Sequence, residues 1–481
     1  MTQRNLVDIG ELTLAEAGAA FRRRQFSPLQ LTETYLQRIA QADGVLNSFI
    51  TVTADAARAA AQRATEELAA GTDRGPLHGI PIAYKDLIAT AGVRTTSASR
   101  IFAERTPEAD ATVVSALTRA GVVCLGKLNM LECAYGVVHP DFGAALNPWS
   151  LQHSSGGSSS GSAVAVAAGL CLGALGTDTG GSIRIPAAWC GIVGHKPTYG
   201  LVSRHGVDAL SWSLDHVGPM TRTVQDAALL LEGMTGFDPL DPGSAPVDRF
   251  RATALDTVEV QRLRIGVPRE LLATGIDSEV RGIIDGALNL LGDCVGSIDV
   301  AELPSSDELL ATEFVIMFAE AAAYHQPWLR TRPADYAPLT RDRLEAGSAI
   351  PAIHYIDAQR QRRELVDQFA RLHKRFDVLA LPAAPTAAMG SSDNSLMISG
   401  EPTDVFHGLI RLTGMFNVTG APAVSVPCGW TTAGLPVGLQ LAGRHFEDHV
   451  VLAAARAFEQ AHGETVRLPG LPLGPLSQVG A

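Results

Sequence analysis

Residues 152–162 read QHSSGGSSSGS, and residues 176–187 read GTDTGGSIRIPA. Each stretch combines a Gly-Gly pair with serine, and the first runs directly into AVAVAAGLCLGALG (163–176), which has the pattern of a buried helix and strand. A flexible linker does not continue into buried elements, so these glycines are expected to let the backbone approach another group closely. The two stretches therefore predict tight turns at the ends of core elements.

A glycine-rich run before a helix can also bind phosphate, because free N–H groups at a helix start attract anions. A P-loop would require G-x-x-x-x-G-K-[ST], with the lysine reaching the phosphates. The residues after the two Gly pairs read SSSGS (158–162) and SIR (182–184), with no lysine. The sequence therefore disfavours nucleotide binding.

The same turns are suited to acyl transfer. Backbone N–H groups at a Gly-Gly turn can stabilise negative charge on a carbonyl oxygen, and a serine there can attack the carbonyl carbon. The base stays open, because there is no G-x-S-x-G elbow and neither His195 nor His216 has the context of a triad partner. Lys85 follows the apolar run GIPIAY (79–84), but taken alone it is better explained as a surface lysine with a buried stem.

Composition narrows the class of protein. The chain has 481 residues, 46% of them hydrophobic, which is enough for a large packed core. Its net charge of −12, with RRR (22–24) as the one dense basic run, argues against a nucleic-acid-binding surface. No apolar run is long enough to cross a bilayer, so we expect a cytoplasmic protein without membrane contact.

Cysteine and histidine spacing predicts no metal site. The 6 cysteines include no C-x-x-C pair and lie in apolar surroundings, which favours buried reduced thiols over disulfides or zinc. His445 and His449 in HFEDH share a spacing of four residues, but we interpret them as solvated side chains because the order is not H-E-x-x-H.

Short apolar runs alternate with helical patterns after about residue 70, which predicts an α/β sheet layered by helices. About residues 1–70 are expected to be helical, with a capping box at Thr13 and Glu16 and an N-cap at Ser27 before Pro28. The strand-like runs are GIPIAYKDLI (79–88), GVVCLGKL (121–128), RIGVP (264–268), FDVLALP (376–382), APAVSVP (421–427) and PVGLQLAG (436–443).

We expect residues 1–481 to form a single domain. Residues 239–262 are rich in Pro, Asp and Arg with weak periodicity and are interpreted as a surface excursion, since a strand-like run resumes directly after them. Residues 468–481 are rich in Pro and Gly and are interpreted as a C-terminal tail.

GGSSSGSAVAVAAG (156–169) and GTDTGGSIRIPAAWCGIVGHKPTYGLVSRHG (176–206) together resemble the signature region of the amidase signature family. These are serine hydrolases with a Ser–cis-Ser–Lys triad. The similarity extends to GPLHGIPIAYKDLI (75–88), to residues 126–136 and 213–234 and to the strands at 421–443, and it is loose at about 240–400. It implies the amidase signature fold, a central mixed β-sheet covered by helices on both faces, with N-terminal helices.

The resemblance also implies the catalytic residues. The nucleophile is expected at Ser182, the cis-serine that relays the proton at Ser158, and the base at Lys85, whose neutral form burial would favour. The oxyanion hole is expected from the backbone N–H groups of Thr179, Gly180, Gly181 and Ser182. Neither a metal nor a cofactor is implied.

Four further polar residues and four aromatic residues are candidates for a supporting role. We expect Asp178 and Arg184 to hold the nucleophile turn, and Asp215 and Arg222 to do similar structural work. The aromatic side chains, expected to pack in the core or line a pocket, are Phe142, Trp149, Trp189 and Trp212.

The leading hypothesis is a stand-alone amidase that converts an amide to an acid and ammonia or an amine through an acyl-enzyme on Ser182. Its expected partners are a small-molecule amide substrate and possibly a second copy as a homodimer, with no nucleic acid. Esterase side activity is expected, because an acyl-enzyme route also accepts the easier leaving group.

Two alternatives stay open. The first is the glutamine-hydrolysing A subunit of a tRNA-dependent amidotransferase. Against it, DVFHGLIRLTGM (404–415) lacks the acidic residue that the resemblance leads us to expect at glutamine's α-amino group, and residues 343–362 look more like free-standing amidases. The second is a non-catalytic binding protein on the same fold, which is disfavoured because all three triad residues are present.

Overall fold

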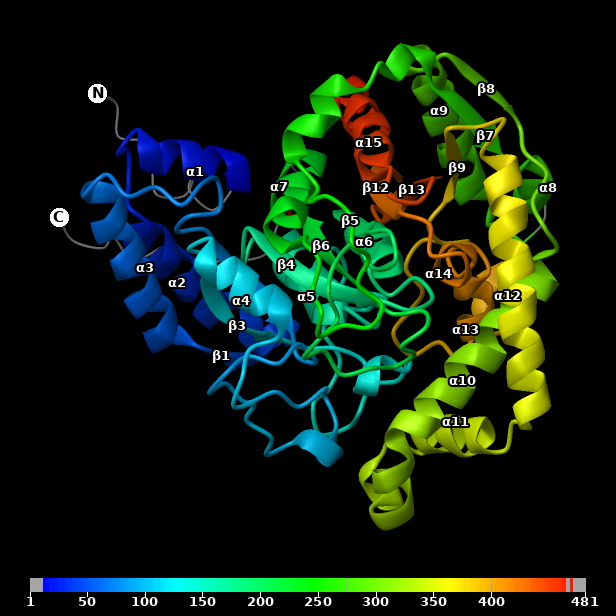
Figure 1. Ribbon diagram of the computed structural model, residues 1–481, viewed down its shortest axis with the longest axis horizontal. Coiled ribbons are helices and arrows are strands. Elements are labelled where there is room, and N and C mark those ends of the chain that lie inside the picture. The colour runs from blue at the N-terminus through cyan, green and yellow to red at the C-terminus, as the bar shows by residue number, and fades with distance from the viewer. Residues whose placement is uncertain (1–11, 274, 399, 464–467, 470–481) are drawn as a thin grey trace.

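The computed structural model describes residues 12–463, except 274 and 399, together with residues 468–469. A mixed sheet of eleven strands runs through this part of the chain, in the order β1-β3-β2-β4-β6-β5-β12-β13-β9-β7-β8 (Figure 1). The strands are β1 (Phe49–Val52), β2 (Pro81–Lys85), β3 (Val123–Leu128), β4 (Gly173–Asp178), β5 (Val193–Lys196), β6 (His216–Thr221), β7 (Arg264–Val267), β8 (Ser297–Val300), β9 (Val378–Pro382), β12 (Ala423–Trp430) and β13 (Pro436–Gly443). A separate pair is formed by β10 (Leu396–Ile398) and β11 (Glu401–Thr403).

The predicted mixed sheet is confirmed. Strand β2 runs parallel to β3 and β4, and β7 runs parallel to β8 and β9, whereas the other neighbouring pairs of the large sheet are antiparallel. Five of the six strand-like runs found in the sequence contain one of these strands, and the sixth, residues 421–427, covers the first part of β12. They are continuous apolar runs because helices cover both faces of the sheet, so β2, β4, β9 and β13 are buried along their whole length.

Helices layer the sheet as expected. Helix α15 packs against α7 and α9, and all three contact the sheet, while α5 and α6 contact each other and the central strands. The helices are α1 (Leu14–Arg22), α2 (Pro28–Leu46), α3 (Ala54–Ala69), α4 (Thr112–Arg119), α5 (Ser160–Ala167), α6 (Arg184–Cys190), α7 (Val224–Met234), α8 (Arg269–Ala273), α9 (Ser278–Cys294), α10 (Ser306–Thr331), α11 (Pro338–Ser348), α12 (Ala352–Leu372), α13 (Val405–Ile410), α14 (Met415–Val418) and α15 (Asp448–His462).

The N-terminal helices begin where the sequence predicts. Thr13 and Glu16 form a reciprocal capping box at α1, and Ser27 and Gln30 form one at α2, with Pro28 in the first turn. Helix α1 is also fixed from outside, because the Asp226 carboxylate of α7 accepts its first two N–H groups at 2.9 and 3.0 Å. The N-terminal layer is thereby attached to the body of the protein.

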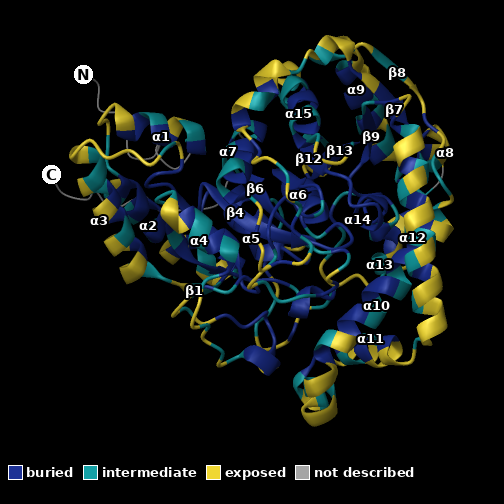
Figure 2. Cartoon of the chain, in the orientation of Figure 1, coloured by how far each residue is buried: buried dark blue, intermediate teal, exposed yellow. Residues whose placement is uncertain are grey.

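Helices α10, α11 and α12 form a layer at the edge of the molecule, on the right in Figure 1. Figure 2 shows that the outer face of α12 is exposed, whereas the strands and α5 at the centre are buried. Helix α10 packs against α11, α12 and α14, and this brings its side chains close to the centre of the molecule. The sequence analysis did not identify these helices as elements.

We propose that residues 1–481 form one domain, since a single continuous sheet joins both halves of the described chain. Within the predicted excursion at 239–262, the structure has two short 3-10 helices, Ala252–Thr257 and Val260–Arg262. Residues 1–11 of the expected helical segment and 470–481 of the expected tail lie outside the described residues. None of the described helices has both the length and the apolar character that a membrane crossing requires.

Candidate active site

The structure brings Lys85 and Ser158 into direct contact. Lys85 ends β2, and its Nζ lies 2.8 Å from Ser158 Oγ and 2.8 Å from Thr177 Oγ1 on the neighbouring strand β4. The peptide bond between Gly157 and Ser158 is cis. Both side chains are buried, as the family resemblance implies for Lys85, and the interpretation of Lys85 alone as a surface lysine is wrong.

Burial sets the protonation state of Lys85. Because the ammonium form is poorly solvated here, the pKa of Lys85 is lowered to about 7, against the opposing attraction of Asp178 and Asp215. A substantial fraction of the amine is therefore neutral at neutral pH. A neutral amine at 2.8 Å can accept the Ser158 hydroxyl proton.

Ser182 lies in the turn between β4 and α6. It is partly exposed, unlike Lys85 and Ser158, and its carbonyl oxygen accepts a hydrogen bond from the N–H of Ser159 at 3.2 Å. The two serine-rich turns thus lie against each other. Ser158, which contacts Lys85, is therefore adjacent in the chain to Ser159, which bonds to the Ser182 turn.

The four expected oxyanion-hole amides are not equivalent. The N–H of Gly181 donates to the Asp178 carboxylate at 2.8 Å and is therefore engaged. Among the described residues, the N–H groups of Thr179, Gly180 and Ser182 have no hydrogen-bond acceptor. Three of the four amides are therefore free to meet a negatively charged oxygen.

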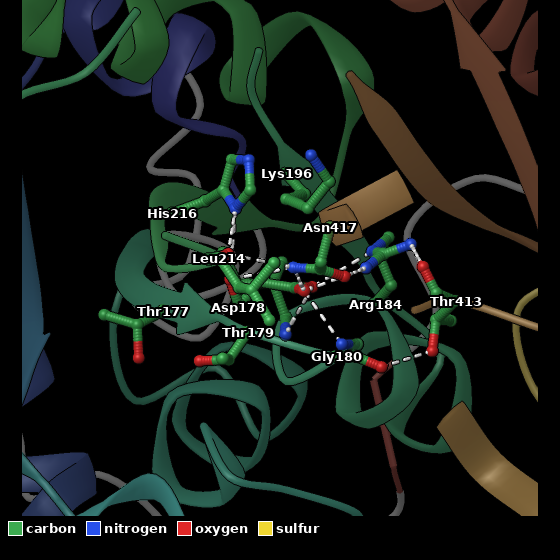
Figure 3. A network of polar contacts seen from close by, with 12 residues as sticks. Thr177, Asp178, Thr179, Gly180, Arg184, Lys196, Leu214, His216, Thr413 and Asn417 are labelled. Atoms are coloured by element: carbon green, nitrogen blue, oxygen red, sulfur yellow. Dashed lines mark hydrogen bonds and ion pairs between the residues drawn. The ribbon is translucent and has the colours of Figure 1, made fainter. Parts of the chain in front are cut away.

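A buried polar network holds this turn (Figure 3). The Asp178 carboxylate accepts hydrogen bonds from Arg184 at 2.8 and 3.0 Å, from Asn417 at 2.8 Å, and from the N–H of Ile183 at 3.0 Å. Burial alone would raise the pKa of Asp178, but Arg184 and the other donors hold it well below its usual range. Asp178 and Arg184 therefore have the positioning role that the sequence analysis expected.

The network joins distant parts of the chain. Arg184 also donates to the carbonyl of Thr413 at 2.9 Å, to Gln440 of β13 at 2.6 Å and to Asn417 of α14 at 2.6 Å. All five of its N–H groups are thus used. The sequence analysis did not find Asn417 or Gln440, because nothing in their local sequence marks them as partners of a residue more than 200 positions away.

Asp215 supports the turn from the other side. It accepts a hydrogen bond from the Thr179 hydroxyl at 2.6 Å and from the N–H groups of Leu210 and Ser211. Burial raises its pKa to about 6, against these hydrogen bonds. Arg222 lies elsewhere, since its guanidinium donates to the carbonyl of Leu12 near the N-terminal helices.

A cavity of about 400 Å³ opens beside the turn. Thr177 and Thr179 line it, together with Trp212 from the four aromatic candidates. The other three aromatic residues are not part of its lining. Asp215, expected to have a structural role, and His216 also line the cavity, together with the polar residues Tyr199, Arg204 and Asp208, which no sequence motif marks.

The family model described as Amidase matches residues 30–452. The chain belongs to the amidase signature family. The A subunit of a glutamyl-tRNA(Gln) amidotransferase from Roseiflexus sp. (strain RS-1) is 40% identical to it over 96% of this chain and 99% of the relative's own length. The similarity to this relative therefore extends along almost the whole chain.

Two solved structures are also similar to this chain along most of its length. The crystal structure of the A subunit of a glutamyl-tRNA(Gln) amidotransferase from Thermotoga maritima has 34% identity and a TM-score of 0.79, with 96% of this chain and 98% of that chain covered. A structure from work on a vestigial protein complex and the evolutionary origins of an s-triazine catabolic enzyme has 34% identity and a TM-score of 0.89, with 93% and 98% covered.

These family members correct the expectation about partners. A small-molecule amide as the substrate, no nucleic acid and a possible homodimer were expected, but the relatives are subunits of enzymes named for a charged tRNA. The error arose from the net charge of −12, which describes the surface of one chain. In an assembly of several subunits, contacts with nucleic acid can be made by another chain, so this charge does not exclude it.

Proposed function

We propose that this chain is the A subunit of a tRNA-dependent amidotransferase, which hydrolyses glutamine and passes the ammonia to partner subunits. The observation that carries the proposal is the Lys85–Ser158 pair beside the Ser182 turn, in a chain 40% identical to such a protein over 96% of its length. The free-standing amidase was the leading hypothesis from sequence, and end-to-end similarity to a named component of an amidotransferase favours the alternative.

In the proposed reaction, Ser182 Oγ attacks the side-chain amide carbon of glutamine. Its proton passes to Ser158 Oγ while the Ser158 proton passes to Lys85 Nζ. The negative charge on the amide oxygen is met by the free N–H groups of Thr179, Gly180 and Ser182. Lys85 then returns a proton through Ser158 to the amide nitrogen, and ammonia leaves.

The second half of the reaction regenerates the enzyme. Water attacks the glutamyl ester on Ser182, gives its proton to the same relay, and releases glutamate as the seryl oxygen is reprotonated. Because esters have a better leaving group and can form the same kind of acyl-enzyme, the site would also hydrolyse them. For a protein that acts with charged tRNA, we propose the cytoplasm as the compartment.

The test measures glutamate and ammonia formed from glutamine by the chain alone and by the chain with partner subunits from the same genome. We expect slow hydrolysis by the chain alone, at least tenfold faster hydrolysis once partners and Glu-tRNA(Gln) are added, and none with Ser182→Ala. Fast turnover of other amides with glutamine untouched would contradict the proposal and favour a free-standing amidase. A chain inactive in every combination would favour a binding protein.

A further inference from the structure

Glu313 is a buried carboxyl group without a hydrogen-bonding partner. It lies on α10, its side chain is 1% exposed, and neither oxygen has a partner among the described residues. Glu320, two turns further along the same helix, is also buried but accepts hydrogen bonds from Ser211, Ser213 and Tyr355. Since buried polar groups are normally paired, the isolation of Glu313 requires an explanation.

The Glu313 carboxyl lies against the nucleophile turn. Its Oε1 is 2.6 Å from the position that a Cβ on Gly180 would occupy, and its Oε2 contacts Gly414 just beyond α13. The Ile410 side chain packs at the same place, with Cδ1 3.3 Å from that Gly180 position. Glu313 therefore reaches the surroundings of Gly180, two residues before Ser182, from a different element.

No cation of the described residues neutralises this carboxyl group. The charge of Arg184 acts on it, but all five Arg184 N–H groups are donated elsewhere. Burial is the main cause that raises the pKa of Glu313 well above its usual range, and the nearby charge of Asp178 adds to it. Burial therefore favours the neutral carboxyl group, and a cation within bonding distance would favour its charged form.

We propose that Glu313 binds the ammonium group of the substrate, and that the site selects amides that carry a protonated amine at the far end of the acyl chain. Glutamine, with its α-ammonium group, belongs to this class, so the inference rests on and deepens the proposed function. A carboxylate and an ammonium group form a short, charge-assisted hydrogen bond, which a methyl group or a hydrogen atom in place of the ammonium cannot make. Glu313 thereby supplies an acidic group beside Ile410 of residues 404–415, where Asp404 instead caps α13 by accepting the N–H of His407 at 2.8 Å.

The experiment compares matched amides with the chain in its assembly with partner subunits. Glutamine is paired with 4-carbamoylbutanoate, which lacks only the amine, and 5-aminopentanamide is paired with hexanamide, in which a methyl group replaces the ammonium. We expect the wild type to prefer the ammonium-bearing member of each pair at least tenfold in kcat/KM. Equal rates within both pairs would overturn the proposal without any variant.

Glu313→Gln keeps the shape of the side chain and removes its charge. We expect kcat/KM for the ammonium-bearing amides to fall about 100-fold, mainly through KM, while the two amides without an amine stay within about twofold. Glu308→Gln, on the exposed part of the same helix, is the matched control and should change neither pair. Equal losses for both members would identify Glu313 as a purely structural residue, and no loss would also overturn the proposal.

A second variant tests whether a carboxylate near Gly180 is sufficient for the ammonium preference, whichever residue carries it. Adding Ile410→Asp to Glu313→Gln places a carboxylate beside Gly180 from α13, and we expect it to restore the ammonium preference.

The proposed function and the proposed role of Glu313 are contradicted by different results. If glutamine is not hydrolysed but 5-aminopentanamide is preferred in a Glu313-dependent manner, only the amidotransferase function fails. If glutamine is hydrolysed equally well by Glu313→Gln, only the role of Glu313 fails.

Discussion

At the scale of single residues, Lys85 has an environment that makes it a plausible base. Its Nζ has two hydroxyl partners, Ser158 and Thr177, at 2.8 Å each, and no carboxylate within ion-pair distance among the described residues. Lys127 on the adjacent strand is equally buried but lies 3.6 Å from the Asp86 carboxylate. The difference means that Lys85 can lose its proton without leaving an unpaired carboxylate behind.

Lys85 gives the first prediction, a pH dependence of the rate. Since the pKa of Lys85 is lowered to about 7 and the neutral amine is the active form, kcat/KM for an amide should fall as pH decreases through about 7, about tenfold per unit well below it. Initial rates in buffers from pH 5 to 9 measure this. Asp215→Asn should move the midpoint to lower pH, because the Asp215 charge opposes the shift of Lys85. A rate independent of pH across this range would remove Lys85 as the base.

The sequence was informative about these residues to different degrees. Motif resemblance pointed to Lys85, Ser158 and Ser182, because the segments around them resemble family motifs. It did not point to Thr177, although Thr177 lies in GTDTGGS, or to Glu313, because the first contacts Lys85 and the second approaches Gly180 only when distant elements pack together. Contacts between elements distant in sequence carry no local pattern.

At the scale of elements, hydrophobic periodicity was sufficient for the central sheet. Strands such as β2 and β13 are continuous apolar runs bounded by Gly or Pro, and they fold as predicted. Helix α10 was missed because it is in contact with α11, α12 and α14, so its buried residues do not form one stripe. The elements that shape the substrate side of the site were therefore the least predictable.

The cap of α1 gives the second prediction. Asp226→Ala removes the acceptor for the N–H groups of Leu14 and Ala15 and should lower the free energy of unfolding by about 1–3 kcal/mol. Chemical denaturation followed by circular dichroism measures the change. Asp55→Ala on α3, whose side chain is fully exposed, is the control and should stay within about 0.5 kcal/mol. Equal stability of the two variants would show that the contact between α1 and α7 contributes nothing.

At the scale of the whole molecule, the burial of the cysteine side chains shows how closely the core is packed. All six are free thiols, and Cys133, Cys171, Cys190 and Cys428 are buried. Burial raises the pKa of these thiols, to about 12 for Cys171, so very little reactive thiolate forms at neutral pH. The expectation of buried reduced thiols therefore holds for these four, while Cys124 and Cys294 are partly exposed.

The third prediction follows from this distribution. In the native protein at pH 8, a thiol reagent such as DTNB should react with at most two cysteines over minutes, whereas in guanidinium chloride it should titrate all six. The absorbance of the released thiolate gives both counts. Six fast thiols without denaturant would mean that the core opens readily, and fewer than six with denaturant would mean that a disulfide is present.

The polar network around Arg184 has a consequence for how the protein is made. The triad residues all lie within the first 182 residues, so a ribosome exposes them well before Asn417 and Gln440, which complete the bonding of Arg184. A partly synthesised chain therefore has the triad but lacks the groups that hold its nucleophile turn. We therefore expect activity at this site only once almost the entire polypeptide has been made, and chains truncated before Asn417 are expected to be inactive.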